Sequence, residues 1–139
     1  MQLNRYLKNY DTFIAALLGF FAVRIFCSYS GIGISPDSIM YVSAARSLNT
    51  NGTLQTFNHL PIVDFPVFYP IFLGIIKFIT RIDPVIFGSI LNGLMFATLI
   101  YFSGWIMHRF VPTSRVYKWL MLVAIILSPA LLQVYSYLI

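Results

Sequence analysis

Charged residues are scarce in this chain. They make up 9% of its 139 residues, and only four of them are acidic. A soluble domain carries about 25% charged residues. So few charges cannot cover a water-facing surface, and with 59% of the residues hydrophobic, lipid must cover most of the molecule. The composition therefore excludes an ordinary soluble domain and predicts an all-α polytopic membrane protein.

Cysteine and the common catalytic motifs are also missing. The single cysteine, Cys27, excludes an internal disulfide. The sequence contains no Gly-rich phosphate-binding loop, no metal-spaced cluster of Cys and His, and no nucleophile elbow. Candidates for chemistry are therefore limited to a few polar groups.

The net charge of +5 does not indicate a nucleic-acid partner. The basic residues lie scattered beside apolar runs rather than in one block. This scatter is typical of the positive-inside rule for membrane proteins. We expect the partner to be a lipid bilayer, with no nucleic acid.

Three apolar stretches are long enough to cross a bilayer, which takes roughly 20 helical residues. They lie at about residues 12–30, 85–107 and 119–139. A fourth stretch, Phe65–Ile76, has only 12 uncharged residues and would cover about 18 Å. We expect this fourth stretch to form a short interfacial helix along the outer membrane surface.

Basic residues set the expected orientation. They occur before the first stretch and again between the second and third spans, and both groups should be cytoplasmic. An even number of crossings must then separate the two groups, so the interfacial helix does not cross. The expected topology has a cytoplasmic N-terminus in a bacterial inner membrane and one large outer loop, residues 31–84. The basic residues concerned are Arg5, Lys8, Arg109, Arg115 and Lys118.

A second helix is predicted within the outer loop. Ser35 is a favourable N-cap, Pro36 suits the first turn, and Asp37 suits the positive end of the helix dipole. Asn51-Gly52 ends the helix. Its apolar and polar residues segregate at helical spacing, which predicts an amphipathic helix lying on the membrane surface.

Three polar residues each allow two interpretations. Asp37 is either a stabilising acid at the helix start or a general base or metal ligand. Arg24 either snorkels to the outer headgroups or provides a cation for a lipid-linked phosphate. Asp64 is either a second functional acid or a solvated loop residue.

The order of several short motifs resembles the N-terminal part of membrane glycosyltransferases of the GT-C superfamily, the group of protein O-mannosyltransferases and lipid A aminoarabinose transferases. In the family, one span is followed by an Asp and a Tyr–x–x–x–Ala helix, then by a Gly and a Pro–x–Tyr–Pro helix, and later by Ser–Pro with Tyr–Ser. In this sequence the motifs are Pro36-Asp37-Ser38, Tyr41–Ala45, Asp64–Pro70, Ser128-Pro129 and Tyr135-Ser136.

The resemblance implies an inverting transferase that moves a sugar from a polyprenyl-phosphate donor to a protein, lipid or glycan acceptor at the outer face. It implies that Asp37 is the catalytic acid, acting as base or as ligand of a divalent metal. Arg24, Asp64 and Tyr69 become candidate substrate-binding residues.

This sequence departs from the family at three points. Ser38 stands where members often have a second acid. A further acid normally follows the Tyr–Ser element, and the given sequence ends at Ile139. Members also run to several hundred residues, so we expect residues 1–139 to be one transmembrane region, an inactive N-terminal piece of a longer enzyme. Two alternatives from other classes remain: a small non-enzymatic membrane subunit or scaffold, and a transporter fragment that uses Arg24 and Asp37.

Overall fold

The computed structural model describes residues 10–63, 65–110 and 114–138. The fold is mostly helical (77%), as the sequence predicts. Among the described residues the chain forms two compact units. Unit 1 takes in the described residues of Met1–Gly31 and Ser89–Ser136, and unit 2 takes in those of Ile32–Gly88 and Tyr137–Ile139.

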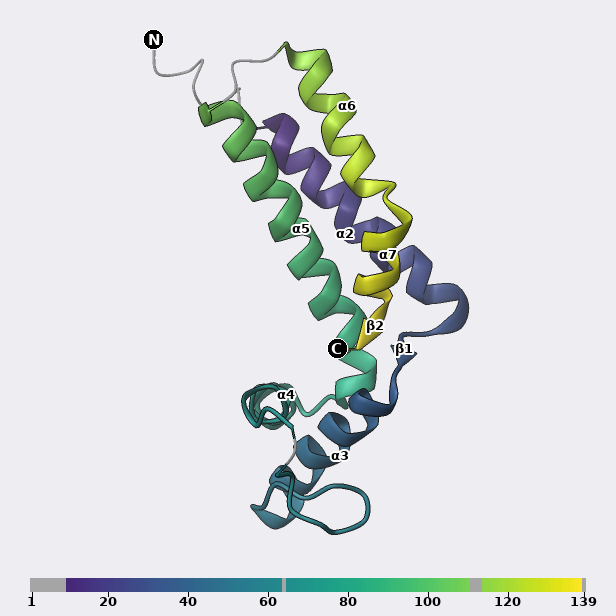
Figure 1. The fold of residues 1–139 in the computed structure, drawn as a ribbon, viewed down its shortest axis with the longest axis vertical. Coiled ribbons are helices and arrows are strands. Elements are labelled where there is room, and N and C mark those ends of the chain that lie inside the picture. Colours follow the sequence, from purple (N-terminus) through teal and green to yellow (C-terminus); the bar gives the residue numbers. More distant parts are fainter. Residues whose placement is uncertain (1–9, 64, 111–113, 139) are drawn as a thin grey trace. The chain divides into compact units, whose positions relative to one another are not determined.

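Unit 1 contains the helices that are long and apolar enough to cross a membrane (Figure 1). These are α2 (Tyr10–Ser30) and α5 (Pro84–Phe110), of which the part from Ser89 belongs to this unit. A third candidate is the pair α6 (Arg115–Ile126) and α7 (Pro129–Ser136). By length and composition the described residues therefore offer two spans, or three if this pair counts as one.

The third predicted span, 119–139, is not one straight helix. Helices α6 and α7 are bent by 47° at the break between them. Pro129 has no N–H to continue the helical ladder, and its ring would clash with the carbonyl four residues earlier. The Ser128 N–H instead bonds the Ile125 carbonyl at 3.2 Å, which tightens the last turn of α6. The prediction of a helix to residue 139 was also wrong at its end, because Tyr137–Leu138 form strand β2.

Helices α2 and α5 pack closely in opposite directions, and glycine makes this approach possible. A Cβ at Gly93 would lie 2.9 Å from the Phe20 ring and 3.4 Å from the Phe20 carbonyl oxygen. A Cβ at Gly104 would lie 2.5 Å from the Thr12 methyl group. Small residues of this kind let helix backbones approach each other within membranes.

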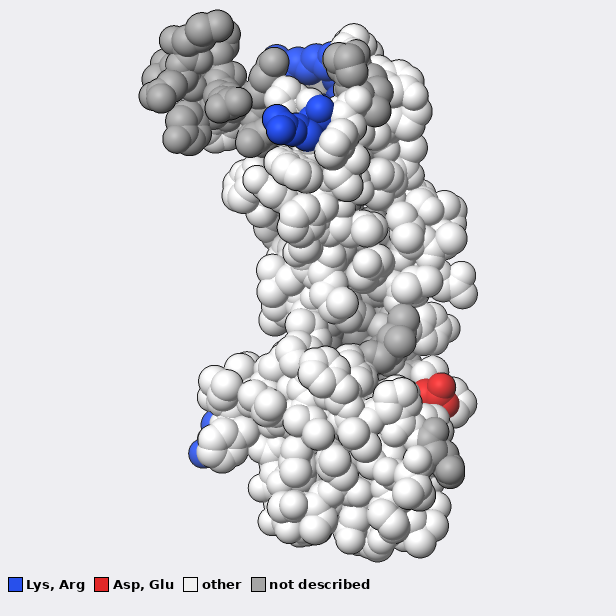
Figure 2. All heavy atoms as spheres, turned by 60° about the vertical axis from the view of Figure 1, so that its left-hand side comes forward, with Lys and Arg blue, Asp and Glu red and all other residues white. Residues whose placement is uncertain are grey.

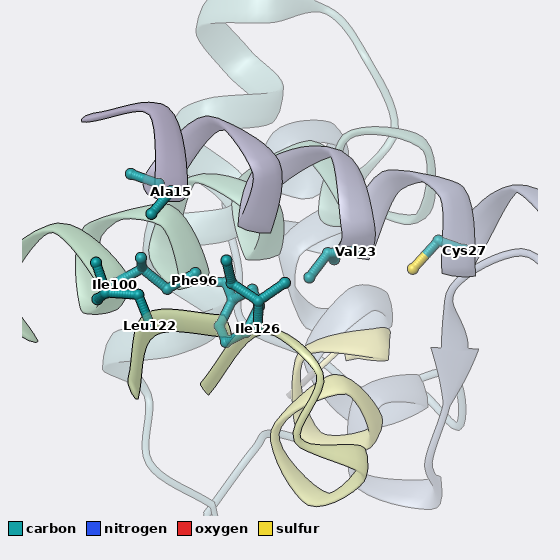
Figure 3. Packing of buried hydrophobic residues seen from close by; sticks show 8 residues of the cluster. Ala15, Val23, Cys27, Phe96, Ile100, Leu122 and Ile126 are labelled. Carbon is teal, nitrogen blue, oxygen red and sulfur yellow. The ribbon is translucent and has the colours of Figure 1, made fainter. Parts of the chain in front are cut away.

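The core of unit 1 lies where α2, α5 and α6 meet. Figure 3 shows Phe96 and Ile100 of α5 beside Leu122 and Ile126 of α6, with Ala15 of α2 close by. All of these side chains are buried. Many large apolar side chains on the same helices point outward, so the unit has an apolar exterior as well as an apolar core. The outward-facing residues include Leu18, Phe21, Leu94, Phe102, Leu120 and Val123.

The start of α2 and the start of α6 lie at the same end of unit 1. Arg115 donates two hydrogen bonds to the Asp11 carboxylate, with N–O distances of 2.8 and 2.7 Å. The contact between Thr12 and Gly104 brings the end of α5 to this end as well. Figure 2 shows Lys and Arg atoms gathered there, above an uncharged middle surface. Arg5 and Lys8, the other basic group of the expected topology, lie outside the described residues.

Unit 2 is built on a helix pair, α3 (Pro36–Asn51) and α4 (Phe68–Thr80). Helix α3 begins and ends as predicted, with Ser35 as its N-cap and Gly52 as its left-handed C-cap at φ 70°. Helix α4 has 13 residues and falls among the apolar helices that are too short to span.

The two helices of this pair bury the face of α3 that the sequence assigns to the membrane surface. Ala44 and Ala45 are fully buried, as is Leu73 of α4. The side-chain amide of Asn49 donates to the Gly74 carbonyl at 2.9 Å. The apolar face of α3 therefore packs on α4, and the prediction that this face lies on the membrane surface was wrong.

Candidate functional site

Asp37 lies in the first turn of α3, in a segment whose backbone is firmly capped. The Ser38 N–H donates to the Ser35 hydroxyl at 3.2 Å, and the Ser35 N–H donates to the Ser38 hydroxyl at 3.0 Å. This reciprocal capping box, with Pro36 in the first turn, fixes the helix start without using the Asp37 carboxylate.

A second anchor fixes the residue next to Asp37. Strand β1 (Gly33–Ile34) pairs in parallel with β2 (Tyr137–Leu138). The fully buried Ser38 hydroxyl donates to the Leu138 carbonyl. Its only proton is used there, so the Ser35 hydroxyl is the donor in the 2.8 Å bond between the two serines. Ser38 thus acts as a structural anchor for the start of α3.

The Asp37 side chain itself is exposed. Of the three acidic residues in the described part of the chain, Asp11 pairs with Arg115 and Asp83 pairs with Arg46 and Lys77. Asp37 makes no ion pair or side-chain hydrogen bond with any described residue. Its carboxylate is therefore the one described acid still available to a ligand.

Tyr69 lies near the α3 face that carries Asp37. Its ring meets the ring of Tyr41 edge to face, with centroids 5.3 Å apart. Tyr41 follows Asp37 by four residues, so both lie on one side of α3. Burial, with a smaller contribution from Tyr41, raises the pKa of Tyr69 to about 12. The phenol thus keeps its proton at neutral pH and remains a hydrogen-bond donor.

Arg24 belongs to unit 1, whereas Asp37 and Tyr69 belong to unit 2. Its guanidinium donates to the Ser89 hydroxyl on α5, and it makes no ion pair with an acid in the described part of the chain. The side chain is partly buried and directed at protein. The remaining predicted residue, Asp64, lies outside the described residues.

An ionic cluster centred on Asp83 was not predicted from the sequence. Arg46 donates two hydrogen bonds of 2.8 Å to the Asp83 carboxylate, and the Lys77 ammonium lies 3.6 Å from it. Asp83 also caps α5 through the Val85 N–H at 3.1 Å. The Asp83-Pro84 pair is a recognisable helix start, so its position was available from the sequence, although its partners were not.

This ionic cluster leads to a pH-dependence prediction. The hydrogen bonds from Arg46 hold the pKa of Asp83 below its usual range. Its stabilising contribution is therefore complete above the ordinary Asp pKa and is lost as the pH falls through the lowered value. Because Arg46 is half exposed, we expect the contribution to be at most about 1 kcal/mol.

The test compares Asp83→Asn with the wild type, since asparagine keeps the cap and removes the charge. Amide hydrogen exchange in α4, corrected for intrinsic rates, should show faster opening of the variant at neutral pH and no difference in strong acid. Asp37→Asn is the matched control and should leave α4 opening unchanged at both pH values. A difference between wild type and Asp83→Asn that persists in acid would contradict the ionic explanation.

The described residues offer few ligands for a divalent metal. Such an ion takes six or more oxygen ligands or keeps several waters beside one or two carboxylates. The described residues contain no group of three or more His, Cys, Asp or Glu side chains that could hold a metal. Asp37 is the one unpaired acid among the described residues, and no reaction step is assigned to a metal.

No protein-family model matches this sequence, and neither curated proteins nor solved structures give a significant match.

Proposed function

We propose that this chain is the N-terminal membrane region of an inverting glycosyltransferase. It would move a sugar from a polyprenyl-phosphate donor to a protein, lipid or glycan acceptor at the outer face of the membrane. One observation carries the proposal. Asp37 presents an exposed carboxylate, unpaired among the described residues, at the anchored start of α3.

Direct displacement at the anomeric carbon needs such a group. A carboxylate takes the proton of the acceptor hydroxyl while the lipid phosphate leaves, and cations stabilise the departing phosphate. Arg24, which makes no ion pair with a described acid, keeps its proposed substrate-binding role. Tyr69 is a suitable hydrogen-bond donor to sugar or phosphate oxygens, and Asp64 keeps its proposed substrate-binding role.

We further propose that α2, α5 and the bent pair α6–α7 cross a bacterial inner membrane, with the N-terminus cytoplasmic. Support comes from the lengths of these helices, their outward apolar side chains and the basic end of unit 1. In this arrangement residues 31–84, including Asp37, lie on the outer side.

Single-cysteine labelling tests this topology. Cys27 is buried among apolar side chains, so Cys27→Ala is a suitable background. We expect a membrane-impermeant maleimide added to intact cells to label Thr53→Cys and Asn58→Cys, both at exposed positions. Thr113→Cys, outside the described residues, should react only after the membrane is opened. External labelling of Thr113→Cys would show the topology to be wrong.

Transfer activity is tested on a complete protein carrying this segment. Membranes containing it should transfer labelled sugar from one member of a panel of polyprenyl-phosphate sugars, and Asp37→Asn should abolish this transfer. A non-enzymatic subunit would be indifferent to that substitution. A transporter would move substrate across sealed vesicles without breaking the sugar–phosphate bond.

A further inference from the structure

Helix α4 has two opposite apolar faces, and described residues of the protein cover only one of them. Pro70, Leu73 and Gly74 are buried on the α3 side. On the opposite side a second apolar row follows the helical spacing of four, three and four residues. This row, here called the outer stripe, consists of Phe68, Phe72, Ile75 and Ile79.

Three of the four residues of the outer stripe are exposed, and Phe72 is partly buried. Phe68 is 78% exposed, Ile75 51% and Ile79 72%. The Phe68 and Phe72 rings stack with centroids 6.5 Å apart, which makes that end of the stripe continuous. Scattered single apolar residues are normal on a surface, but an aligned row of this kind indicates an interaction site.

Helix α3 completes a two-layer arrangement. The exposed residues of α3 are mostly polar and include Asp37, Arg46 and Thr50. The α3–α4 pair as a whole is therefore polar on its α3 side and apolar on its α4 side. This division is the one expected of a body that lies at an interface between water and hydrocarbon.

Two further observations favour a bilayer as the occupant. Only residues 81–83 separate α4 from α5, a candidate span, so the end of α4 lies within about 14 Å of the start of α5. The exposed Arg81 guanidinium sits 5.1 Å from the centre of the Phe78 ring, and Arg81 makes no ion pair with a described acid. A cation beside an apolar stripe complements the phosphates of anionic phospholipids.

We propose that α4 lies flat in the surface of an anionic bilayer, with the outer stripe among the acyl chains and α3 on the water side. This inference rests on the membrane insertion proposed above. Packed helices lie 8–10 Å apart, so α3 and Asp37 are held roughly one helix diameter above α4. The acid is thereby kept at the height of lipid headgroups rather than in the hydrocarbon.

Fluorescent probes on single cysteines test the inference in the Cys27→Ala protein. The protein is reconstituted in vesicles of phosphatidylethanolamine and phosphatidylglycerol that contain acyl-brominated lipid. The polarity-sensitive probe is placed at Phe68→Cys and Ile79→Cys on the outer stripe and at Thr50→Cys on the polar face of α3. Phe102→Cys, on an exposed position of α5, reports membrane insertion independently.

We expect blue-shifted, bromine-quenched emission of similar depth at Phe68 and Ile79, and unquenched, water-like emission at Thr50. Water-like emission at both stripe positions would overturn the inference. A blue shift without bromine quenching would also overturn it, because protein rather than lipid would cover the stripe. Strongly unequal quenching at the two ends would show that α4 crosses the bilayer. Bromine quenching at Phe102→Cys without quenching at Phe68→Cys or Ile79→Cys would reject the surface position of α4 and leave membrane insertion intact. Absence of quenching at Phe102→Cys would reject membrane insertion itself.

Discussion

Asp37→Asn should lower sugar transfer by a complete enzyme carrying this segment by about 10²–10⁴-fold, the usual contribution of general base catalysis. Asparagine nearly matches the shape of aspartate but cannot accept the acceptor proton. The substitution breaks no ion pair or side-chain hydrogen bond with a described residue. The start of α3 also stays fixed, because the Ser35–Ser38 capping box and the bond from Ser38 to Leu138 do not involve Asp37. The loss should therefore appear in turnover while abundance and membrane insertion stay near wild type.

The structural explanation of Asp37 predicts a much smaller effect. A first-turn acid at an exposed helix end contributes about 0.3–1 kcal/mol through the helix dipole. Hydrogen exchange in α3, measured on the same preparations, reports any such loss. Asp83→Asn is the matched control: it changes the same functional group in the same unit, yet its carboxylate is occupied by Arg46, so transfer should survive. If Asp37→Asn keeps more than about a tenth of wild-type turnover, the role of general base is wrong.

Local signals account for the parts of the fold that the sequence predicted well. The start and end of α3 depend on Ser35, Pro36 and Gly52, residues whose effect is confined to one helical turn. Length and composition alone were enough to predict the helices α2 and α5 as candidate membrane spans. The break at Pro129 also had a local signal, which the uninterrupted hydropathy of the last stretch obscured.

Long-range contacts account for what the sequence did not show. Asp83 and Arg46 are 37 residues apart, and Asp11 and Arg115 are 104 apart, so no spacing rule could pair them. The same limit applies to the candidate site. Asp37 was identifiable as a candidate acid, but its availability became visible only when the described acids Asp11 and Asp83 were seen to be paired.

The membrane-facing surfaces illustrate a related difficulty. Amphipathic spacing shows that a helix such as α3 has an apolar face, but not whether lipid or protein covers it. Helix α4 covers the apolar face of α3, and α4 carries a second apolar row on its opposite side. Hydropathy alone does not separate these two kinds of surface, because both are apolar.

Replacing Phe96 by alanine should cause the largest loss of stability in unit 1. Phe96 is fully buried, lies in the cluster between α2, α5 and α6, and packs its ring against Tyr135 of α7 at a centroid distance of 4.9 Å. Removing such a side chain costs about 3–5 kcal/mol, through lost contacts and the cavity left behind.

Phe102→Ala is the matched control, since it makes the same change on the same helix at a position 55% exposed. Both variants gain equally in helix propensity, so propensity cancels in the comparison. Lipid or detergent contacts Phe102 in the folded and unfolded states alike, and its loss should stay below about 1 kcal/mol. Unfolding of both variants in mixed micelles, followed by far-ultraviolet circular dichroism as denaturing detergent is added, gives the two free energies. Equal losses would mean that the Phe96 cluster is not the core of the folded unit, and the packing of α5 against α2 and α6 would then be wrong.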